Sequence, residues 1–275
     1  MCSTCGCSNT DKITYTKPGD KVMVETLNHH HEHEHEHGHH HGHHNHHHHN
    51  HAHSHDHHHH SIIELEQDIL MHNNLIAERV KGYLAAKNIF AMNLVSSPGS
   101  GKTSILERTL KDLKDEIKFY VIEGDQQTMQ DANRIDAVGI PVIQINTGKA
   151  CHLDSEMIFK ALENLQPEEN SVLMIENVGN LVCPAGFYLG EDKRVVIIST
   201  TEGDDKPLKY PDMFESADIC LINKIDLLPY VPFDIEKVKE YAGRINPNMQ
   251  FFEVSALTGE GMNHWYDWLK KQLKK

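Results

Sequence analysis

Short apolar runs alternate with helical patterns along most of the chain after residue 61. Seven of these runs predict strands, at residues 90–97, 119–123, 141–145, 172–176, 195–199, 219–223 and 251–254. The runs are nearly continuous rather than alternating, which is typical of strands that helices cover on both faces. The pattern therefore predicts an α/β fold, with a doubly wound, mainly parallel sheet flanked by helices.

Two helical patterns frame these strands. The first follows a capping-box pattern at Ser61 and Glu64 and predicts a helix from residue 62 to about Lys87. Its apolar residues recur at steps of three, four or seven: Ile62, Leu65, Ile69, Ile76, Val80 and Leu84. This stripe predicts packing against the sheet, and a dimer-facing surface is the alternative. The second pattern predicts a closing helix over 262–274, with Trp265, Trp268 and Leu269 on one face.

The first 60 residues have a different composition. Residues 8–28 are polar and aperiodic, and 22 of the 32 residues from 29 to 60 are histidine. Such a segment cannot form an apolar core. We therefore expect a largely disordered, Cys/His-rich metal-binding tail over 1–60, ordered structure from Ser61, and one globular domain over 61–275.

Charge and composition exclude several classes of function. The net charge is −14, of which −10 belongs to residues 61–275, and an acidic domain argues against a nucleic-acid partner. We find neither an apolar run long enough for a membrane span nor a secretory signal pattern. The expected location is the cytoplasm, where the six cysteines stay reduced and are available for metal binding or packing.

The segment SSPGSGKT, residues 96–103, joins a predicted strand to a predicted helix. That context is typical of a phosphate-binding loop, in which glycines let backbone amides face the phosphates. Lys102 would reach the β- and γ-phosphates, and Thr103 would bind Mg²⁺. The predicted nucleotide contacts in this loop are Gly99, Ser100, Gly101, Lys102, Thr103 and Ser104.

The segment NKID, residues 223–226, ends another predicted strand. The carboxylate of Asp226 can accept hydrogen bonds from guanine N1 and N2, a pair of donors that adenine lacks. A polar turn after a strand is the alternative, but together with the phosphate loop the motif favours guanine. The predicted base-binding residues are Asn223, Lys224 and Asp226, with the loop Ser255, Ala256 and Leu257.

Acidic residues at two further strand ends are candidates for catalysis. Glu176 and Gly179 form an ExxG segment in which Glu176 would hold Mg²⁺ and the Gly179 amide would sense the γ-phosphate. Asp125 is a second candidate near the magnesium ion, although it is equally well placed to cap a helix over 127–138. We predict catalytic roles for Lys102, Asp125 and Glu176, and slow hydrolysis because no glutamine is evident to orient the water.

The N-terminus carries a dense set of soft metal ligands. Cys2, Cys5 and Cys7 lie within six residues, a spacing typical of metal sites, and a disordered tail with incidental thiols is the alternative. After removal of Met1, the amine of Cys2 would complete a square-planar N,S₃ set that favours nickel over zinc.

The histidine tract at residues 29–60 predicts a second mode of metal binding. Its imidazoles are neutral above about pH 6.5 and bind divalent ions weakly but in number. At about four ligands per ion, the tract would hold roughly five ions. Interruptions by Glu, Asn and Gly argue against an expression tag, so we interpret the tract as a metal store.

A third set of ligands lies in the globular part. Cys151 and His152 are expected to begin a helix, and Cys183 follows Glu176 by seven residues. Buried cysteines and an exposed histidine without a metal are the alternative. The position of Cys183, directly after a segment expected to respond to the γ-phosphate, favours a metal site that responds to the nucleotide.

Taken together, MCxxCGC, the histidine tract, SSPGSGKT, ENVGNLVCPAGF at 176–187 and NKID resemble the HypB family of hydrogenase nickel-incorporation GTPases. The resemblance implies a GTPase of the SIMIBI class that dimerises on binding GTP. It further implies delivery of nickel to the large-subunit precursor of nickel–iron hydrogenase, with a small zinc-bearing metallochaperone as partner.

The resemblance also assigns the ligand sets. Cys2, Cys5 and Cys7 are similar to the tight nickel site. Cys151, His152 and Cys183 are similar to the nucleotide-linked site, which bridges or lies near two subunits. The implied ligands are GTP or GDP, Mg²⁺ and Ni²⁺, with Zn²⁺ able to occupy the nickel sites.

Two other functions fit parts of this pattern. A urease-type nickel GTPase also carries a histidine tract, but it joins Cys, Pro and His in one run, whereas Cys151 and Cys183 are separated here. A non-enzymatic nickel or zinc store with a vestigial nucleotide site is the alternative from another class.

Overall fold

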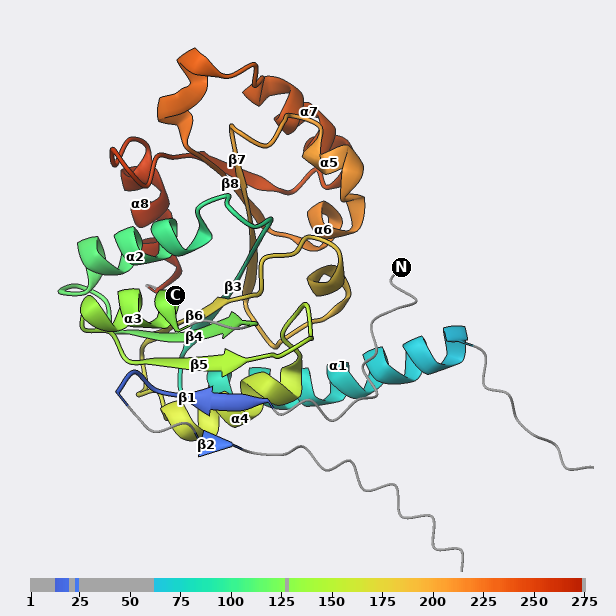
Figure 1. The fold of residues 1–275 in the computed structure, drawn as a ribbon, viewed down its shortest axis with the longest axis vertical. Coiled ribbons are helices and arrows are strands. Elements are labelled where there is room, and N and C mark those ends of the chain that lie inside the picture. The colour runs from blue at the N-terminus through green and yellow to red at the C-terminus, as the bar shows by residue number, and fades with distance from the viewer. Residues whose placement is uncertain (1–12, 20–22, 25–61, 127–128, 274–275) are drawn as a thin grey trace, which may run out of the picture.

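Nine strands form one sheet in the order β2-β1-β5-β4-β6-β3-β7-β8-β9 (Figure 1). The computed structural model describes residues 13–19, 23–24, 62–126 and 129–273. The strands are β1 (Thr14–Thr16), β2 (Met23–Val24), β3 (Phe90–Ser96), β4 (Phe119–Asp125), β5 (Val142–Asn146), β6 (Val172–Glu176), β7 (Lys193–Ser199), β8 (Ile219–Asn223) and β9 (Gln250–Glu253).

The seven strands from β3 to β9 pair in parallel, which confirms the predicted sheet. The strands β1 and β2 correct the expectation that order begins at Ser61. β1 pairs antiparallel with β5, so that Thr14 lies opposite Asn146. Tyr15 is buried among the core residues of that side. Residues from before the histidine tract therefore extend the sheet at one edge.

Helices cover both faces of the sheet. They are α1 (Ile62–Ala86), α2 (Lys102–Leu113), α3 (Gln130–Ala137), α4 (Ser155–Leu165), α5 (Lys206–Lys209), α6 (Pro211–Ser216), α7 (Ile235–Ile245) and α8 (Met262–Gln272), with the 3₁₀ helices η1 (Cys183–Gly186) and η2 (Ile225–Tyr230). Alternation along β7 shows the two faces: Val195 and Ile197 pack with α2, α3 and α8, whereas Val196 and Ile198 pack with α6 and α7.

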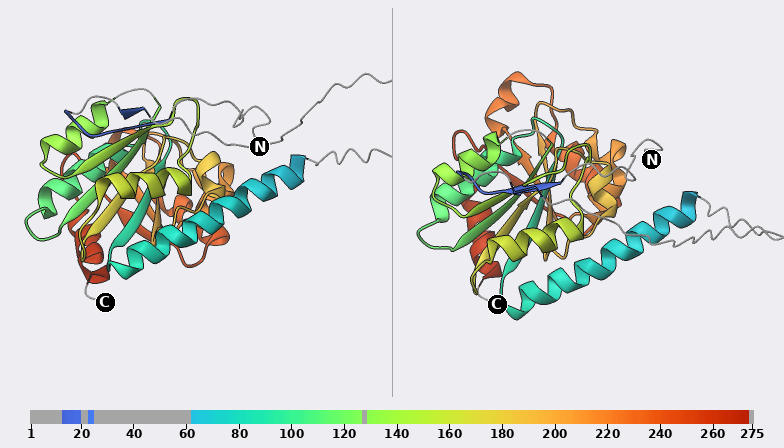
Figure 2. Two further views of the ribbon diagram at one scale, coloured as in Figure 1. Left: turned by 90° about the horizontal axis from the view of Figure 1, so that it is seen from below. Right: turned by 60° about the horizontal axis from the view of Figure 1, so that its bottom comes forward.

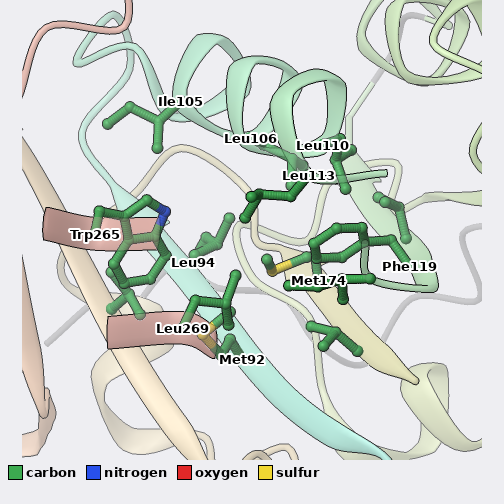
Figure 3. Packing of buried hydrophobic residues seen from close by; sticks show 14 of the residues in the cluster. Met92, Leu94, Ile105, Leu106, Leu110, Leu113, Phe119, Met174, Trp265 and Leu269 are labelled. Carbon is green, nitrogen blue, oxygen red and sulfur yellow. The ribbon is translucent and has the colours of Figure 1, made fainter. Parts of the chain in front are cut away.

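The core on the α2 and α8 face is built from aromatic and branched side chains (Figure 3). Trp265 is 1% exposed and donates its indole N–H to Thr109 Oγ1 at 3.1 Å, so its one polar group is satisfied. Trp268 stacks on Trp265 with ring centroids 5.2 Å apart. Leu269 is also buried, so the predicted apolar face of the closing helix is confirmed.

The helix α1 is packed along only part of its length. Val80 and Leu84 are buried against α4 and the sheet, as the apolar stripe predicts. Ile69 is 42% exposed, so the prediction is wrong for that position. The reason is geometric: the N-terminal end of α1 projects beyond the other helices (Figure 2). Within the described residues, no helix has the length and apolar character that a membrane crossing requires.

At β3 the order of the strands changes direction: β4, β5 and β6 lie on one side of it, and β7, β8 and β9 lie on the other. This strand lies between β6 on one side and β7 on the other. In an open parallel sheet such a switch point leaves a crevice beyond the carboxyl ends of the strands, where ligands bind. The loop after β3 and the ends of β4, β6 and β8 meet at this edge.

Candidate nucleotide site and metal centre

The loop from Ser96 to Lys102 turns β3 into α2 with two glycines in left-handed conformation. Gly99 has φ 81° and Gly101 has φ 92°, values that side chains disfavour. A Cβ on Gly101 would also lie 2.4 Å from Asn223 Nδ2. This residue must therefore be glycine both for its conformation and for contact with the end of β8, which carries the NKID segment.

The side chains that follow the loop converge on Glu176. Lys102 Nζ lies 2.6 Å from Glu176 Oε1, and Thr103 donates its hydroxyl to the same oxygen at 2.6 Å. Glu176 is fully buried. The structure thus brings together the predicted phosphate-binding lysine, the predicted Mg²⁺-binding hydroxyl and the predicted catalytic carboxylate.

Glu123 is a second buried carboxylate at this site that sequence analysis did not identify. It is the register partner of Glu176 on the neighbouring strand and is 2% exposed. Burial, and next the charge of Glu176, raise the pKa of Glu123 to about 9. A glutamate inside the buried run YVIEG was the signal that could have revealed it.

The two carboxylates fit a magnesium ion. Among the described residues, neither Glu123 Oε2 nor Glu176 Oε2 finds a hydrogen-bond partner, although both atoms are buried. Buried charge without partners is costly unless a cation compensates it. Hard oxygen donors beside a phosphate-binding loop suit Mg²⁺.

A cavity of about 440 Å³ lies over the loop and both carboxylates. Asp125 lines it at the end of β4 and accepts a hydrogen bond from the Gln126 amide at 2.6 Å. The alternative role of Asp125 as a helix cap is wrong, because α3 begins at Gln130 after Met129.

Three further charged residues at the loop were not predicted. Asp131 and Arg134 from α3 line the cavity. Lys206 donates to Ser97 Oγ at 2.9 Å and forms an ion pair with Glu202. These residues lie far from the loop in sequence and carry no recognisable motif, so only the fold reveals them.

The NKID segment closes the other end of the phosphate loop. Asn223 is buried, donates to the Ser100 carbonyl at 2.9 Å and accepts from the Ala256 amide at 3.2 Å. Lys224 donates to the Gly99 carbonyl at 2.8 Å. One asparagine therefore ties together the phosphate loop and the loop 255–257.

The residues expected to contact the base have different degrees of exposure. Asp226 lies half-buried in η2, Ser255 is buried, and Leu257 is 82% exposed. Ser255 Oγ accepts from the Thr258 amide at 3.1 Å, which helps to fix the turn. The structure places this loop beside the NKID segment, as the sequence predicts, while the base contacts themselves stay a prediction.

The segment after β6 packs tightly on the phosphate loop. A Cβ on Gly179 would lie 3.3 Å from Pro98 Cγ and 3.4 Å from its Cα. Such close contact leaves little room for a side chain. Gly179, like Ser104, lines the cavity, and its contact with a γ-phosphate stays a prediction.

The structure brings Cys151, His152 and Cys183 together at the far end of this segment. Their ligand atoms all lie within 4.8 Å of one another. The two sulfurs are 2.7 Å apart, and Cys151 Sγ lies 3.8 Å from His152 Nδ1. We call these three residues the metal triad. Two sulfurs and one imidazole are donors that suit nickel or zinc.

The surroundings of the triad differ from expectation in two ways. Cys151 and His152 precede α4, which begins at Ser155 after the capping residue Asp154; the prediction that they begin the helix is wrong because Asp154 provides the cap. His152 is also buried rather than exposed, and its ring packs on Phe187 at a centroid distance of 3.9 Å.

Burial determines the protonation of His152. It lowers the pKa of the imidazole to about 4, because the charged form loses its hydration. The ring is therefore neutral at physiological pH and ready to bind a metal. Cys2, Cys5, Cys7 and the tract 29–60 lie outside the described residues, so their roles remain predictions.

Comparison with known proteins identifies the family of the chain. A family model described as the nucleotide-binding domain of CobW, HypB and UreG matches residues 90–253. This range includes the phosphate loop, both carboxylates, the metal triad and the NKID segment.

Individual relatives match over most of their length. The hydrogenase maturation factor HypB of Escherichia coli is 54% identical over 211 residues, covering 77% of this chain and 73% of that protein. A hydrogenase/urease maturation factor HypB of Helicobacter hepaticus is 42% identical over 214 residues, covering 76% of this chain and 88% of that protein. The crystal structure of Helicobacter pylori HypB in complex with nickel superimposes with a TM-score of 0.69 at 39% identity, covering 74% of this chain and 95% of that one.

Proposed function

Because the chain belongs to the CobW/HypB/UreG family and, within it, to the HypB P-loop GTPases, we propose that it delivers nickel to a hydrogenase precursor under the control of GTP. In this proposal the nickel ion is cargo. The chain binds it at the metal triad, and the nucleotide state decides whether the triad retains or releases it.

One observation carries this proposal. A single segment, residues 176–183, holds a nucleotide-site carboxylate at its start and a triad thiol at its end. Glu176 contacts Lys102 and Thr103 of the phosphate loop, whereas Cys183 contacts Cys151. A shift of Glu176 caused by the phosphates therefore has only seven residues of backbone to cross before it reaches the metal ligand Cys183.

Binding of GTP follows from the geometry of the loop. The amides after Gly99 and the N-terminus of α2 face the phosphates and stabilise their negative charge. Lys102 leaves Glu176 and turns to the phosphate oxygens, where charge-assisted hydrogen bonds replace the ion pair. Asp226 accepts from guanine N1 and N2, and Asn223 holds the loop 255–257 in place.

Release of Glu176 from Lys102 frees it for a second role. Thr103 and Glu176 are positioned to hold Mg²⁺, with Glu123 and Asp125 beside them. When bound, Mg²⁺ neutralises charge that develops on the β- and γ-phosphate oxygens during hydrolysis. Asp125 lines the same cavity, where it would orient the attacking water, and Lys102 would stabilise the charge on the phosphate oxygens.

The metal stations then have separate tasks. The triad offers a metal ion only three protein ligands, so a partner protein can bind the same ion and remove it. Cys2, Cys5 and Cys7 would bind one nickel ion tightly, and the histidine tract would store further ions. Zn²⁺ can compete at each station because it accepts the same donors.

The proposed partners follow from the family. A small zinc-bearing metallochaperone is the partner, and the large-subunit precursor of nickel–iron hydrogenase receives the nickel. GTP favours a homodimer, which brings two triads together or completes each with groups from the other subunit. The protein acts in the cytoplasm, where apo-hydrogenase is matured.

Nickel titration in each nucleotide state tests the proposal. The full chain is compared with a chain that lacks residues 29–60 and carries Ser at positions 2, 5 and 7, which retains β1 and β2. The triad should then bind about one nickel ion per chain, with different affinity in the GDP and GTP states. Equal affinity in both states would contradict nucleotide control.

The remaining functions make different predictions. For a nickel or zinc store with a vestigial nucleotide site, Lys102→Ala should leave nickel delivery intact and GTP turnover should be absent. The phosphate loop argues against this, because it keeps Gly101, Lys102 and Thr103 although Ser96 replaces the usual first glycine. A urease-type GTPase should activate apo-urease rather than apo-hydrogenase. The 54% identity to a hydrogenase maturation factor favours hydrogenase.

A further inference from the structure

Asn177, next to Glu176, has a fully buried side chain between the two sites. Its Oδ1 accepts hydrogen bonds from the Leu153 amide at 3.1 Å and from the Val178 amide at 3.0 Å. Its backbone amide donates to the Leu94 carbonyl at 3.0 Å, on the strand that leads to the phosphate loop. Asn177 therefore joins the nucleotide-site carboxylate to the residue that follows His152.

The other end of the same amide begins a buried polar chain. Asn177 Nδ2 donates to Asn93 Oδ1 at 3.3 Å, and Asn93 Nδ2 donates to Glu191 Oε1 at 3.2 Å. Glu191 in turn pairs with Arg194 at 3.0 Å, and both side chains are nearly fully buried. Each side chain in this polar network has a hydrogen-bond or ion-pair partner, so the side chains hold one another in fixed positions.

Arg194 connects this polar network to the segment that holds Cys183. Its guanidinium donates to the Ala185 carbonyl at 2.9 Å and to the Phe187 carbonyl at 2.8 Å. These carbonyls lie in and directly after η1, which begins at Cys183. Phe187 also packs against the His152 ring. One side of Asn177 thus fixes the loop of Cys151 and His152, and the other fixes the helix of Cys183.

We propose that Asn177 is the positioning residue that couples the nucleotide site to the metal triad. When a phosphate takes Lys102 from Glu176, the backbone at residues 176–177 adjusts, and the Leu153 amide follows Asn177 Oδ1. The distance between His152 and the Cys183 thiol then changes with the nucleotide. This inference rests on the proposed function, because it requires a metal that binds at the triad.

Cobalt absorption in the full-length chain tests the coupling. With Ser at positions 2, 5 and 7, a thiolate-to-Co²⁺ charge-transfer band reports the triad, because imidazoles of the histidine tract give no such band. Apparent Co²⁺ affinity is measured with GDP and with a non-hydrolysable GTP analogue. Competition by the tract cancels in the ratio of the two affinities.

Three variants separate coupling from simple stability. Asn177→Ala should shift the ratio toward one by about fivefold or more, the value of one buried hydrogen bond. Asn177→Asp retains the acceptor for the Leu153 and Val178 amides and should retain most of the ratio. Asn164→Ala, on α4, removes a half-buried asparagine whose side chain, among the described residues, donates within its own helix to the Lys160 carbonyl, and it should leave the ratio unchanged.

The outcomes are distinct. A ratio of one in the parent protein would contradict nucleotide control itself, and with it the proposed function. A parent ratio different from one that Asn177→Ala leaves intact would overturn the role of Asn177 alone. Should Asn177→Ala fail to fold, loss of the ratio in folded Asn177→Asp would overturn the assignment, and its retention would support Oδ1 as the coupling atom.

Discussion

Glu123 and Glu176 are register partners on two parallel strands, β4 and β6, and both side chains are buried beside the phosphate loop. Two carboxylates held this close cannot both ionise cheaply without a cation. Lys102 and Thr103 satisfy one oxygen of Glu176, whereas Glu123 is left with burial and a neighbouring negative charge. Glu123 therefore keeps its proton in the folded protein, at the place where we propose that Mg²⁺ binds.

The first prediction concerns the pH dependence of stability. The pKa of Glu123 is about 9 in the folded protein, against an ordinary value of 4.5. Between these values the folded protein holds a proton that the unfolded chain releases, so the free energy of unfolding falls as pH rises from about 4.5 to 9. Between pH 5.5 and pH 8.5 the metal- and nucleotide-free parent should lose about 4 kcal/mol of unfolding free energy for this reason. Glu123→Gln should remove this loss.

Urea unfolding at both pH values provides the measurement. Glu163→Gln, on the exposed side of α4, is the matched control and should keep the parent's pH dependence. An unchanged pH dependence in Glu123→Gln would mean that Glu123 is ionised in the folded protein.

A second prediction concerns base specificity. Asp226→Asn replaces one of two acceptors with a donor. Xanthine carries a carbonyl where guanine carries its 2-amino group, so the asparagine amide matches xanthine and mismatches guanine. GDP affinity should fall by about tenfold or more while XDP affinity rises. Calorimetric titration of both nucleotides measures this, with the exposed Asp136→Asn as control; equal losses for both would indicate that Asp226 does not contact the base.

A third prediction separates conformation from contact at the phosphate loop. Gly101→Ala adds strain at φ 92° and a clash with Asn223 Nδ2, whereas Gly99→Ala adds strain at φ 81° but contacts no atom within 4 Å. Without nucleotide, Gly99→Ala should cost about 1 kcal/mol and Gly101→Ala clearly more.

The control for these glycines is Gly243→Ala, in the last turn of α7, where a Cβ has open space. That change should stabilise the protein by up to about 1 kcal/mol, because alanine favours the helix. Thermal unfolding ranks the three variants. Equal effects for Gly99→Ala and Gly101→Ala would show that the loop yields and that the contact with Asn223 is not needed.

The strands and the nucleotide motifs could be predicted from the sequence because both depend on local pattern. Strands buried on both faces leave continuous apolar runs, and their observed ends fall within two residues of prediction. β1 was not predicted because it is a short strand of three residues whose partner, β5, lies about 130 residues later in the sequence. Its signal was weak: Ile13 and Tyr15 are buried while Thr14 and Thr16 are half-exposed, an alternation of period two.

Tertiary relations account for what the sequence did not show. Cys151 and Cys183 were grouped on the position of Cys183 after the ExxG segment and on resemblance, but that their sulfurs meet depends on the loops after β5 and β6 lying at one edge of the sheet. Glu123 was overlooked because a strand pattern hides a single polar residue. The burial of His152 depends on Phe187, 35 residues away, and periodicity gives no information about such a contact.

The final prediction follows from that burial. The pKa of His152 is about 4 in the folded protein and 6.5 ordinarily. As pH falls from 6.5 to 4, His152 takes up a proton in the unfolded chain but not in the folded metal-free protein. The free energy of unfolding is therefore highest above pH 6.5 and falls by up to about 3 kcal/mol by pH 4. His152→Gln should flatten this decline even if it weakens packing on Phe187 at every pH. The slope of unfolding free energy against pH is the measurement, and the exposed His264→Gln should keep the parent slope. A parent-like slope in His152→Gln would show that the imidazole keeps its ordinary pKa in the fold, and protons would then compete with metal at the triad below about pH 6.5.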